Sequence, residues 1–485
     1  MSTATDPSGA ASPVPAVHPQ SLVEQALAAS VADHCVVIVR AQSTANLRWA
    51  NNTLTTNGVM SSVGVTVVSF VGSGGGTSSG SVSGSATTQA QVTDLVRRAD
   101  AAARAAGPAE DANPLLTPDD SPAGVDWDDA PVPTDIHVYD VFAPALGEAF
   151  GRAGSAGRVL YGFVNHEVTT TYLGSSTGLR LRHVQPTGHY GCTGKTGAAV
   201  GGPGHTESAW VGGATRDFTD VDALAMEAEL EQRLAWGRRR VDLPAGRYDT
   251  ILPPSSVADL VIDAYWSAGA RTAWEGQSVF SRRPTGTRIG EPIAAPGVRL
   301  FSDPAHPGLE CAPFVTAASS GNDASVFDNG LPLGATDWIR DGELTSLLQT
   351  RHSAAMTSQP VTPAVDNLVL AVDGATGSVA DLVAGTERGL LLTCLWYIRE
   401  VDPQTLLLTG LTRDGVYLVE HGEVTASVNN FRFNESPVDL LRRFSHASAT
   451  VPSFSREWGD DYFSRTATPA LRVPDLNMSS VSQAI

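Results

Sequence analysis

The chain has 485 residues, of which 42% are hydrophobic and 17% charged, and its formal net charge is −19. The length indicates two or three domains, and the apolar fraction excludes a largely disordered chain. The acidic balance, with Lys195 as the single lysine, argues against nucleic acids and anionic membranes as partners, because phosphate groups bind clustered Lys and Arg side chains.

The spacing of the cysteines and the composition of the first residues predict the cellular location of the protein. The four cysteines lie far apart, without a C-x-x-C pair: Cys35, Cys192, Cys311 and Cys394. This spacing disfavours zinc ribbons and disulfide frameworks and predicts a reducing, cytoplasmic location. Residues 1–19 are polar and rich in Ala and Pro, which predicts a disordered tail without a signal peptide. No apolar run reaches about 18 residues, so we expect no membrane span.

The first half predicts an α/β domain over residues 20–245. Before residue 107 we expect a helix at Ser21–Val31, short strands at Val36–Val39, Leu47–Trp49 and Val65–Val71, a Gly/Ser loop at Gly72–Gly84 and a helix at Thr88–Ala106. After an acidic Pro/Asp-rich connection over 107–134 we expect a helix at Tyr139–Arg152, strands at Arg158–Val164 and Gly178–His183, a long loop or set of tight hairpins at Gly188–Gly213, and a helix from Thr219 to the basic residues Arg238–Arg240.

The second half predicts a β-rich domain over residues 246–485, which makes the whole chain an α+β protein. After a strand at Tyr248–Leu252, apolar residues recur at helical spacing over Ser256–Ala273, with Ser256 as the predicted N-cap. Strands are then expected at Val298–Phe301, Ser325–Asp328, Asn367–Val372, Leu390–Ile398, Leu406–Gly410 and Gly415–Val419, followed by a short helix at Pro437–Phe444. The last 35 residues are polar and weakly patterned.

Two familiar functional patterns occur in the wrong context. G-x-S-x-G is found at Gly76–Gly80 and at Gly174–Gly178, but the first lies in Ser/Gly-rich sequence and the second leads into a strand, whereas a nucleophilic serine needs a sharp strand-to-helix turn. Gly194-Lys195-Thr196 ends like a phosphate-binding loop, yet His189 stands where that motif needs glycine, and the following glycines cannot begin a stable helix. A glycine-rich hairpin is the simpler interpretation.

Histidine and cysteine side chains offer few metal or nucleophile candidates. His166-Glu167 and His205-Thr206-Glu207 have no second histidine at helical spacing, and strand alternation sends His166 and Glu167 to opposite faces. A self-sufficient metal-dependent hydrolase that uses His166, Glu167 and His205 stays open as an alternative. Cys394 lies in an apolar run and is expected to be buried, whereas Cys192, in a glycine-rich segment, is a candidate for an exposed, reactive thiol without an identifiable base.

Side-chain amides gather in two segments of the second half, Ser325–Leu333 and Val428–Pro437. Amides on exposed strands suit hydrogen bonding to an extended peptide. Four residues are therefore candidates for a peptide channel: Asp328, Asn329, Asn429 and Asn430. Asparagine is also a common residue of tight turns, so a purely local role for these side chains stays open.

Several ordered strings resemble the TldD/TldE (PmbA) family, and the resemblance runs from about Leu22 to Leu440. The strings are Glu387–Leu390, Leu395–Pro403, Leu408–Gly415 and Val428–Pro437, with further similarity at Ser325–Gly330, His166–Leu179 and Asn51–Asn52. The family was once described as modulators of DNA gyrase and is now understood as a peptidase. The resemblance implies a TldD/PmbA-like fold of two domains.

The resemblance further implies a subunit of a heterodimeric zinc metallopeptidase that cleaves small unstructured peptides. A TldD-type subunit carries H-E-x-x-x-H on a helix of the C-terminal domain and a later cysteine, whereas a TldE-type subunit lacks these ligands. The corresponding helix here reads Val-Ile-Asp-Ala-Tyr-Trp-Ser-Ala over Val261–Ala268, and no suitable cysteine follows Cys394. We therefore expect a TldE-like chain without catalytic or metal-binding residues, whose TldD-like partner holds the zinc. A binding or assembly protein without peptidase activity is a further alternative.

Overall fold

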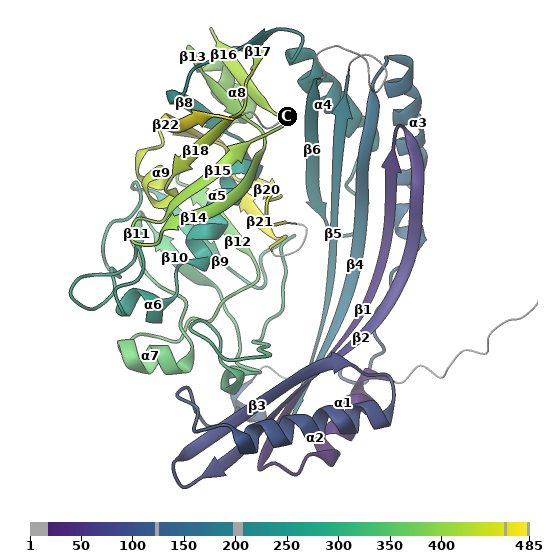
Figure 1. Cartoon of the computed structure of the whole chain (residues 1–485), viewed down its shortest axis with the longest axis vertical. Coiled ribbons are helices and arrows are strands. Elements are labelled where there is room, and N and C mark those ends of the chain that lie inside the picture. Colours follow the sequence, from purple (N-terminus) through teal and green to yellow (C-terminus); the bar gives the residue numbers. More distant parts are fainter. Residues whose placement is uncertain (1–17, 122–125, 197–206, 460–462, 483–485) are drawn as a thin grey trace, which may run out of the picture.

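The computed structural model describes residues 18–121, 126–196, 207–459 and 463–482. Figure 1 shows two parts side by side, a tall curved sheet with its helices and a broader body of sheets and short helices. Residues 1–17 of the predicted tail lie outside the described residues, and Pro19 already begins the first helix, α1 (Pro19–Ala29). None of the helices in the described ranges is both long and apolar enough to pass through a membrane.

A single antiparallel sheet organises residues 34–215, with the strand order β3-β2-β1-β4-β5-β6. The strands are β1 (His34–Ala50), β2 (Thr53–Ser73), β3 (Gly76–Ser85), β4 (Val159–Ser175), β5 (Arg180–Lys195) and β6 (Ser208–Thr215). They are longer than the short apolar runs predicted, because β1 continues through the largely polar stretch Arg40–Asn46, which pairs with β2 on one side and β4 on the other. Pairing partners, and not only hydrophobicity, extend these strands.

Helices cover one face of this sheet, and the second half of the chain packs on the other. α1 and α2 (Gln89–Ala105) bury the β1 residues Val37 and Val39. α3 (Phe142–Ser155) and α4 (Ala223–Trp236) cover the part made by β4–β6. Since side chains alternate along a strand, Val36 and Ile38 point the other way and pack against Phe327 of the second half. The two halves therefore share a core.

Two glycine-rich segments belong largely to strands. Gly72–Gly84, predicted as a loop, is mostly β3, and Gly188–Gly213 contains the end of β5 and most of β6, which pair with Gly191 opposite Gly212. Glycine is required in β3 where α2 approaches closely, because a Cβ atom on Gly80 would lie 2.2 Å from the backbone nitrogen of Ala103. The loop prediction for Gly72–Gly84 was wrong because local composition does not distinguish close helix–sheet packing from a loop. At Gly188–Gly213 the described residues pair as two antiparallel strands, closer to the predicted hairpins than to a long loop, and residues 197–206 lie outside the described residues.

The strands of the second half form two further sheets. One has the order β14-β15-β18-β22-β8-β13-β16-β17-β7, with β19 paired to β22, and the other has the order β11-β10-β9-β12-β21-β20. The first contains β7 (Arg240–Val241), β8 (Gly246–Leu252), β13 (Arg388–Leu392), β14 (Leu395–Asp402), β15 (Leu407–Thr412), β16 (Val416–Glu420), β17 (Glu423–Val428), β18 (Phe431–Glu435), β19 (His446–Ala447) and β22 (Leu471–Val481). The second contains β9 (Val298–Ser302), β10 (Thr336–Arg340), β11 (Glu343–Leu344), β12 (Leu368–Val372), β20 (Val451–Ser453) and β21 (Thr466–Thr468).

The helix α5 (Pro254–Trp266) contacts both of these sheets and buries Leu260 and Val261 in their common core. The helix predicted over Ser256–Ala273 is divided, because a separate short helix, α6 (Ala270–Trp274), follows α5. Ser256 is not the N-cap: Pro253 holds that position, and the Ser256 hydroxyl donates to the Leu392 carbonyl at 2.9 Å. The shorter helices α7 (Arg351–Thr357), α8 (Val379–Ala384) and α9 (Pro437–Arg443) lie outside the sheets.

Another prediction for the second half was wrong, and a stretch for which no element was predicted contains strands. Ser325–Asp328 forms a turn of 3₁₀ helix, η3 (Val326–Asp328), because the Ser325 hydroxyl accepts the Phe327 N–H and closes a turn. The weakly patterned last 35 residues contain β20, β21 and β22, and β22 lies inside its sheet between β8 and β18. Such long-range pairing leaves little local pattern. The domain bounds 20–245 and 246–485 stay predictions.

Candidate functional site

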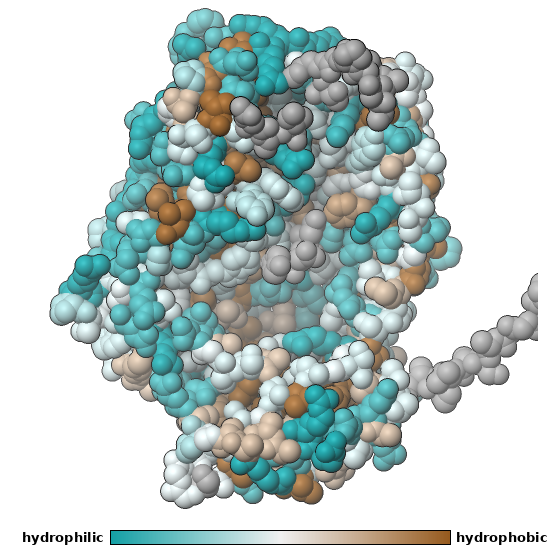
Figure 2. Space-filling view, in the orientation of Figure 1, coloured by the Kyte–Doolittle hydropathy of each residue, from teal (hydrophilic) through white to brown (hydrophobic). Residues whose placement is uncertain are grey.

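A cleft of about 560 Å³ lies between the two halves of the chain. One wall is formed by β5 and β6, and the other by the turn before α5, by β20 and by residues 464–466. In Figure 2 this side of the molecule is hollowed between the halves. The shape of the cleft therefore depends on how the two halves are joined.

Direct contacts at the cleft hold β5 against the second half. The Arg465 guanidinium donates to the Thr187 hydroxyl at 2.6 Å, and the Gln185 amide donates to the Glu310 carbonyl at 3.1 Å. The rings of His189 and Phe454 stack, with their centroids 5.9 Å apart. These contacts join opposite walls of the cleft, so they fix the distance between the two walls.

Each wall of the cleft contains the edge strand of a sheet. Among the described strands, β6 ends the sheet of the first half and β20 ends the smaller sheet of the second half. Gly212–Arg216 and Pro452–Phe454 line the cleft from these two edges. Edge strands present backbone N–H and C=O groups that can pair with a further strand. The arrangement therefore suits the backbone of an extended chain that pairs with one of these edges.

The charged side chains along the cleft are largely paired. Arg465 lies 2.7 Å from the Asp366 carboxylate, and Arg216 lies 3.9 Å from Glu310. Burial lowers the pKa of His183, whose Nε2 lies 2.9 Å from the Gln185 amide oxygen. His183 is therefore uncharged at neutral pH. The walls are polar but nearly neutral, as suits the uncharged amides of a peptide backbone.

Two carboxyl groups, the buried Asp259 and the half-buried Asp263, lie on α5, the helix that begins at the cleft. Asp259 accepts hydrogen bonds from the Ser455 hydroxyl at 2.7 Å and from the Glu457 N–H at 3.0 Å. Burial raises the pKa of Asp259 and of Asp263 to about 7. The Oδ2 atom of each is buried without a hydrogen-bond partner. Both carboxyl groups are therefore held largely in their protonated form below neutral pH.

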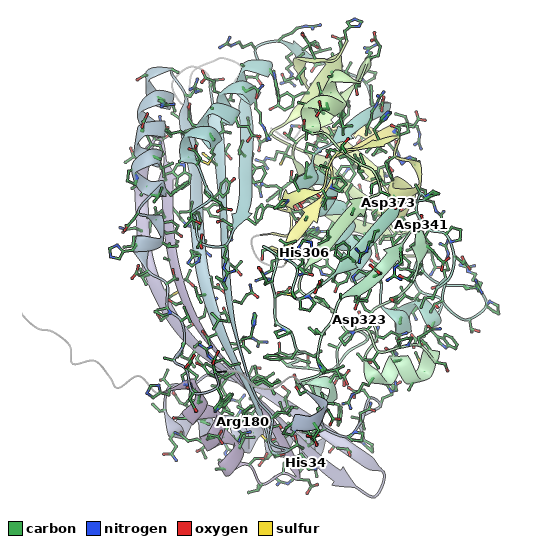
Figure 3. All side chains as sticks on the ribbon, turned by 180° about the vertical axis from the view of Figure 1, so that it is seen from behind. His34, Arg180, His306, Asp323, Asp341 and Asp373 are labelled. Atoms are coloured by element: carbon green, nitrogen blue, oxygen red, sulfur yellow. The ribbon has the colours of Figure 1, made fainter. Side chains whose placement is uncertain are left out.

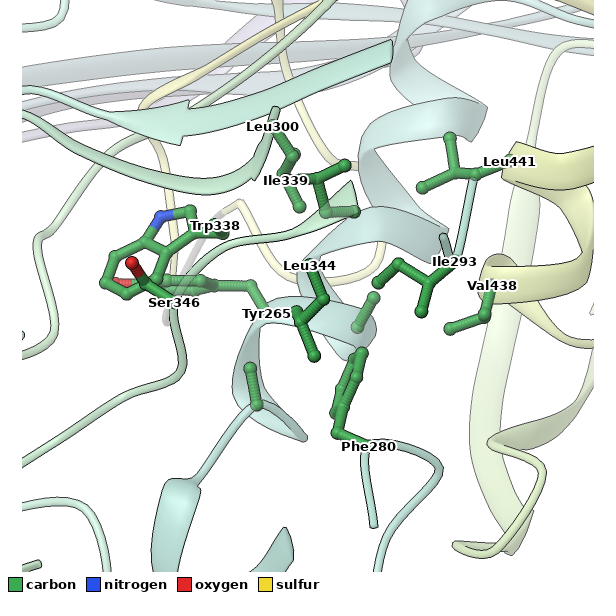
Figure 4. A pocket seen from close by; sticks show the side chains of 12 residues that line it. Tyr265, Phe280, Ile293, Leu300, Trp338, Ile339, Leu344, Ser346, Val438 and Leu441 are labelled. Carbon is green, nitrogen blue, oxygen red and sulfur yellow. The ribbon is translucent and has the colours of Figure 1, made fainter. Parts of the chain in front are cut away.

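No metal-binding cluster is found in the described ranges, since no three His, Cys, Asp or Glu side chains converge there. Figure 3 shows His306, Asp323 and Asp341 apart from one another in the second half, while His34 and Arg180 lie at the far end of the first sheet. A separate cavity of about 20 Å³ lies in the apolar core, among residues such as Tyr265, Trp338 and Leu441 (Figure 4). Its lining gives a bound molecule almost no hydrogen-bond partner, so we regard it as a packing gap.

The four predicted channel residues bind the chain's own backbone and side chains. Asp328 is buried and pairs with the Arg351 guanidinium at 2.6 Å, and Asn329 accepts the Ala317 N–H at 2.6 Å. Asn429 accepts the Leu243 N–H at 2.6 Å, and Asn430 accepts the Thr412 hydroxyl at 3.3 Å. The first pair lies in and just after η3, whereas the second lies between β17 and β18. Their assignment to a channel stays a prediction.

The remaining sequence candidates do not form a site. His166 is buried, with Nδ1 at 2.6 Å from the Thr134 hydroxyl and Nε2 at 2.9 Å from the Arg216 carbonyl, and burial lowers its pKa. Glu167 is more exposed than His166, as strand alternation predicts, while His205 lies outside the described residues. Cys394 is buried as expected. Cys192, predicted as a candidate for exposure, is also buried, because it faces the helices of the first half, and burial raises its pKa to about 12.

Both G-x-S-x-G patterns lack the turn that a nucleophile requires. Ser78 lies inside β3, where its hydroxyl donates to the Ala103 carbonyl at 2.6 Å. Ser176 follows β4, and its hydroxyl accepts the Cys35 N–H at 3.1 Å. In the possible phosphate loop, Lys195 is the last residue of β5, and residues 197–206 lie outside the described residues. Ser78 and Ser176 therefore stabilise the local structure and are not placed as nucleophiles.

Sequence reasoning missed the residues that shape the cleft. Phe454, Arg465 and the β6 edge were not candidates, because their segments were interpreted as loop or as weakly patterned. The available signal was the aromatic and charged run Phe454-Ser-Arg-Glu-Trp458 in an otherwise small and polar tail. The sequence gives no sign, however, that this run meets β5 and β6.

Comparisons with known proteins agree with this architecture. Residues 245–480 match the family model described as PmbA/TldA metallopeptidase C-terminal domain. None of the curated proteins matches the chain. The crystal structure of TldE from Thermococcus kodakarensis is similar with a TM-score of 0.70 and 15% identity, covering 94% of this chain and 99% of that chain.

Two further crystal structures are similar, and both proteins are described as candidate modulators of DNA gyrase. The protein from Bacteroides thetaiotaomicron has a TM-score of 0.72 and 14% identity, covering 96% of this chain and 98% of its own. The protein from Thermotoga maritima has a TM-score of 0.71 and 14% identity, covering 92% and 95%. The predicted α+β class and TldD/PmbA-like fold are thus confirmed, and residues 245–480 belong to the family of PmbA/TldA metallopeptidase C-terminal domains.

Proposed function

We propose that this chain is the non-catalytic, TldE-like subunit of a heterodimeric zinc metallopeptidase that cleaves small unstructured peptides. The observation that carries the proposal is a metallopeptidase domain whose cleft-side helix α5 presents Asp259 and Asp263 and no histidine. A TldD-like partner would hold the zinc, which activates water for attack on a peptide bond. The structural similarity to TldE from Thermococcus kodakarensis supports the proposal at the level of the fold.

The residues on α5 do not fit a catalytic zinc ion. Such an ion takes three protein ligands, chiefly imidazole nitrogen, thiolate sulfur and ionised carboxylate. Burial raises the pKa of Asp259 and of the half-buried Asp263, and the nearby Ser455 offers only a hydroxyl group that donates to Asp259. No third carboxyl, imidazole or thiol group joins them in the described part of the chain. We therefore derive no catalytic step from this chain.

The role proposed for this subunit is to bind substrate backbone in the cleft between β6 and β20. The edge strands of the cleft can pair with a peptide through backbone hydrogen bonds, which do not depend on the peptide's side chains. The cleft therefore suits peptides of varied sequence. Asp328, Asn329, Asn429 and Asn430 would act by fixing the loops of the channel wall, because their side chains bind the chain itself. We place the complex in the cytoplasm, since all four cysteines are free and buried.

The proposal is tested by purifying the chain alone and together with a TldD-like protein that carries H-E-x-x-x-H. We expect the two chains to co-elute in size-exclusion chromatography and to cleave unfolded casein, with activity lost after chelation. The chain alone should neither cleave casein nor retain zinc after dialysis. Stoichiometric zinc or chelator-sensitive cleavage in the isolated chain would contradict the non-catalytic assignment.

A binding or assembly protein without peptidase activity would co-elute with a partner but leave casein intact. The self-sufficient hydrolase built on His166, Glu167 and His205 is less well supported. Both ring nitrogens of His166 already have partners in the chain, and Glu167 lies on the other face of the strand. Casein cleavage by the isolated chain that survives substitution of His166 would not come from that site.

A further inference from the structure

A second, smaller pocket of about 160 Å³ adjoins the cleft. Tyr161, Phe163 and Trp210 form its floor, because the register of β4, β5 and β6 places them on the sheet face that looks toward the second half. Phe454 and Arg456, from the segment after β20, close the opposite side. Tyr190 and Phe454 line both this pocket and the cleft, so the two spaces are neighbours.

A glycine in the floor contributes to the space among these rings. Gly191 lies opposite Phe163 in the register of β4 and β5. A Cβ atom on Gly191 would lie 3.3 Å from the Trp210 indole nitrogen and 3.5 Å from the Phe163 ring. A side chain there would therefore enter the space between the two rings. An apolar cavity of about 150 Å³ accepts benzene, so this pocket has room for one aromatic or branched side chain.

Arg456 provides a positive charge at this pocket. Its guanidinium lies over the rings of Trp210 and Trp396, at 4.9 and 4.4 Å from their centroids. Its Nε atom is buried without a hydrogen-bond partner, and no carboxylate in the described ranges forms an ion pair with it. The neighbouring Glu457 instead accepts the N–H groups of Tyr397 and Ile398 and pairs with Arg399.

The other charged groups near Arg456 do not occupy its guanidinium, which can still donate hydrogen bonds to a ligand. Its charge helps to lower the pKa of the buried Asp259, but Asp259 uses Oδ1 to accept from Ser455 and Glu457. A second cation lies at the rim, since the Lys195 ammonium is 5.6 Å from the centre of the Tyr161 ring. The pocket thus combines aromatic walls with an arginine whose edge can donate to an anion.

We propose that this pocket binds the C-terminal residue of a peptide, with an apolar side chain among the rings and the free carboxylate on Arg456. An arginine fork matches the geometry of a carboxylate and forms stronger hydrogen bonds with it than with a neutral amide. The inference deepens the proposed function, because it rests on peptide binding in the adjoining cleft. The inference also fixes the direction of the peptide in the cleft, because it places the C-terminal end of the peptide beside β6.

The experiment measures binding of N-acetyl-phenylalanine to the full chain, without any partner, by isothermal titration and tryptophan fluorescence. We expect the acid to bind about tenfold or more tightly than N-acetyl-phenylalaninamide, since the amide loses the charge-assisted bond. Arg456→Gln should abolish this preference, whereas Arg399→Gln should retain it. Arg399 is a matched control, because it also stacks on an aromatic ring but is paired with Glu457 and lies outside the pocket.

Equal affinity for acid and amide, or an unchanged preference in Arg456→Gln, would overturn the inference. N-acetyl-aspartic acid α-amide separates a side-chain carboxylate from a chain-terminal one, and equal or tighter binding of this compound would overturn the C-terminal assignment. The comparison of ligands on the unaltered chain needs no variant, so a folding defect in Arg456→Gln leaves the test intact. Because the partner is absent, failure to form an active heterodimer would not affect this result.

Discussion

Two groups of buried charges, one in each half of the chain, are neutralised in different ways. In the first half, Arg158 contacts the buried Glu227 and donates to Glu231 at 2.8 Å. Burial alone would lower the pKa of Arg158, but the two carboxylates outweigh it and the pKa is raised. In the second half, Asp259 and Asp263 share a helix without a hydrogen-bonded cation, and burial raises the pKa of each to about 7.

The difference shows which of these two clusters changes its charge near neutral pH. An ion pair between arginine and carboxylates keeps its charges from weakly acidic to alkaline pH. A buried carboxyl group without a cation is instead neutralised by a proton, which it loses near neutral pH. The N-terminal cluster therefore behaves as a permanent structural element, whereas the two carboxyl groups on α5 couple the stability of the cleft wall to pH.

The largest effect is expected from breaking the N-terminal ion pair. Arg158→Met leaves Glu227 buried without a counter-charge, and we expect the free energy of unfolding to fall by about 3–5 kcal/mol in urea denaturation at pH 7. Arg152→Met is a matched control, because Arg152 pairs with Glu148 on the exposed face of α3. Its loss should be about 0–1 kcal/mol. Equal losses of unfolding free energy in the two variants would show that the buried ion pair contributes no more to stability than the exposed one.

A smaller effect of opposite sign is expected from Asp259→Asn. A carboxyl group whose pKa is higher in the folded than in the unfolded chain stabilises the fold while protonated, so this contribution is complete below about pH 4 and is lost as the pH rises through about 7. The asparagine variant resembles the protonated form at every pH. Its stability relative to the parent should therefore rise by about 2–3 kcal/mol between pH 5 and pH 8.5, because the folded parent loses the Asp259 proton only near pH 7. Unfolding measured across this range checks the result, and identical pH profiles would contradict it.

The smallest effect is expected from Ser455→Ala, which removes the hydroxyl that donates to Asp259 at 2.7 Å. This hydrogen bond favours the charged carboxylate and so lowers the pKa of Asp259. Its loss should cost about 1 kcal/mol at pH 8, less at pH 5, and should move the midpoint of the pH dependence upward. A loss that is the same at both pH values would show that the hydroxyl does not act through the Asp259 charge.

Local sequence patterns predicted the helices better than the sheets. The amphipathic segments that became α1, α2 and α5 were found near their true positions, because helix periodicity and caps lie within one segment. β3 and β22 were not found. Gly80 and its neighbours are small because α2 packs on them, and β22 is a strand because β8 and β18 flank it. Both causes lie far away in the sequence.

The same distinction applies to the candidate site. The absence of histidine on α5 could be seen in the sequence, since a metal motif is a local string. The cleft could not be predicted, because it joins β5 and β6 to residues near 454 and 465. Arg456 gave no sign of its surroundings, which come from Trp210 and Trp396. Sites formed between distant segments need the tertiary structure.

The central place of β22 has a consequence for synthesis on the ribosome. Until residue 481 has left the exit tunnel, β8 and β18 lack the strand that joins them, and both present open edges. The larger sheet of the second half therefore stays incomplete during most of its translation. Nascent chains stalled before residue 471 should bind chaperones that recognise exposed strands, and release should follow once the final strand is inserted.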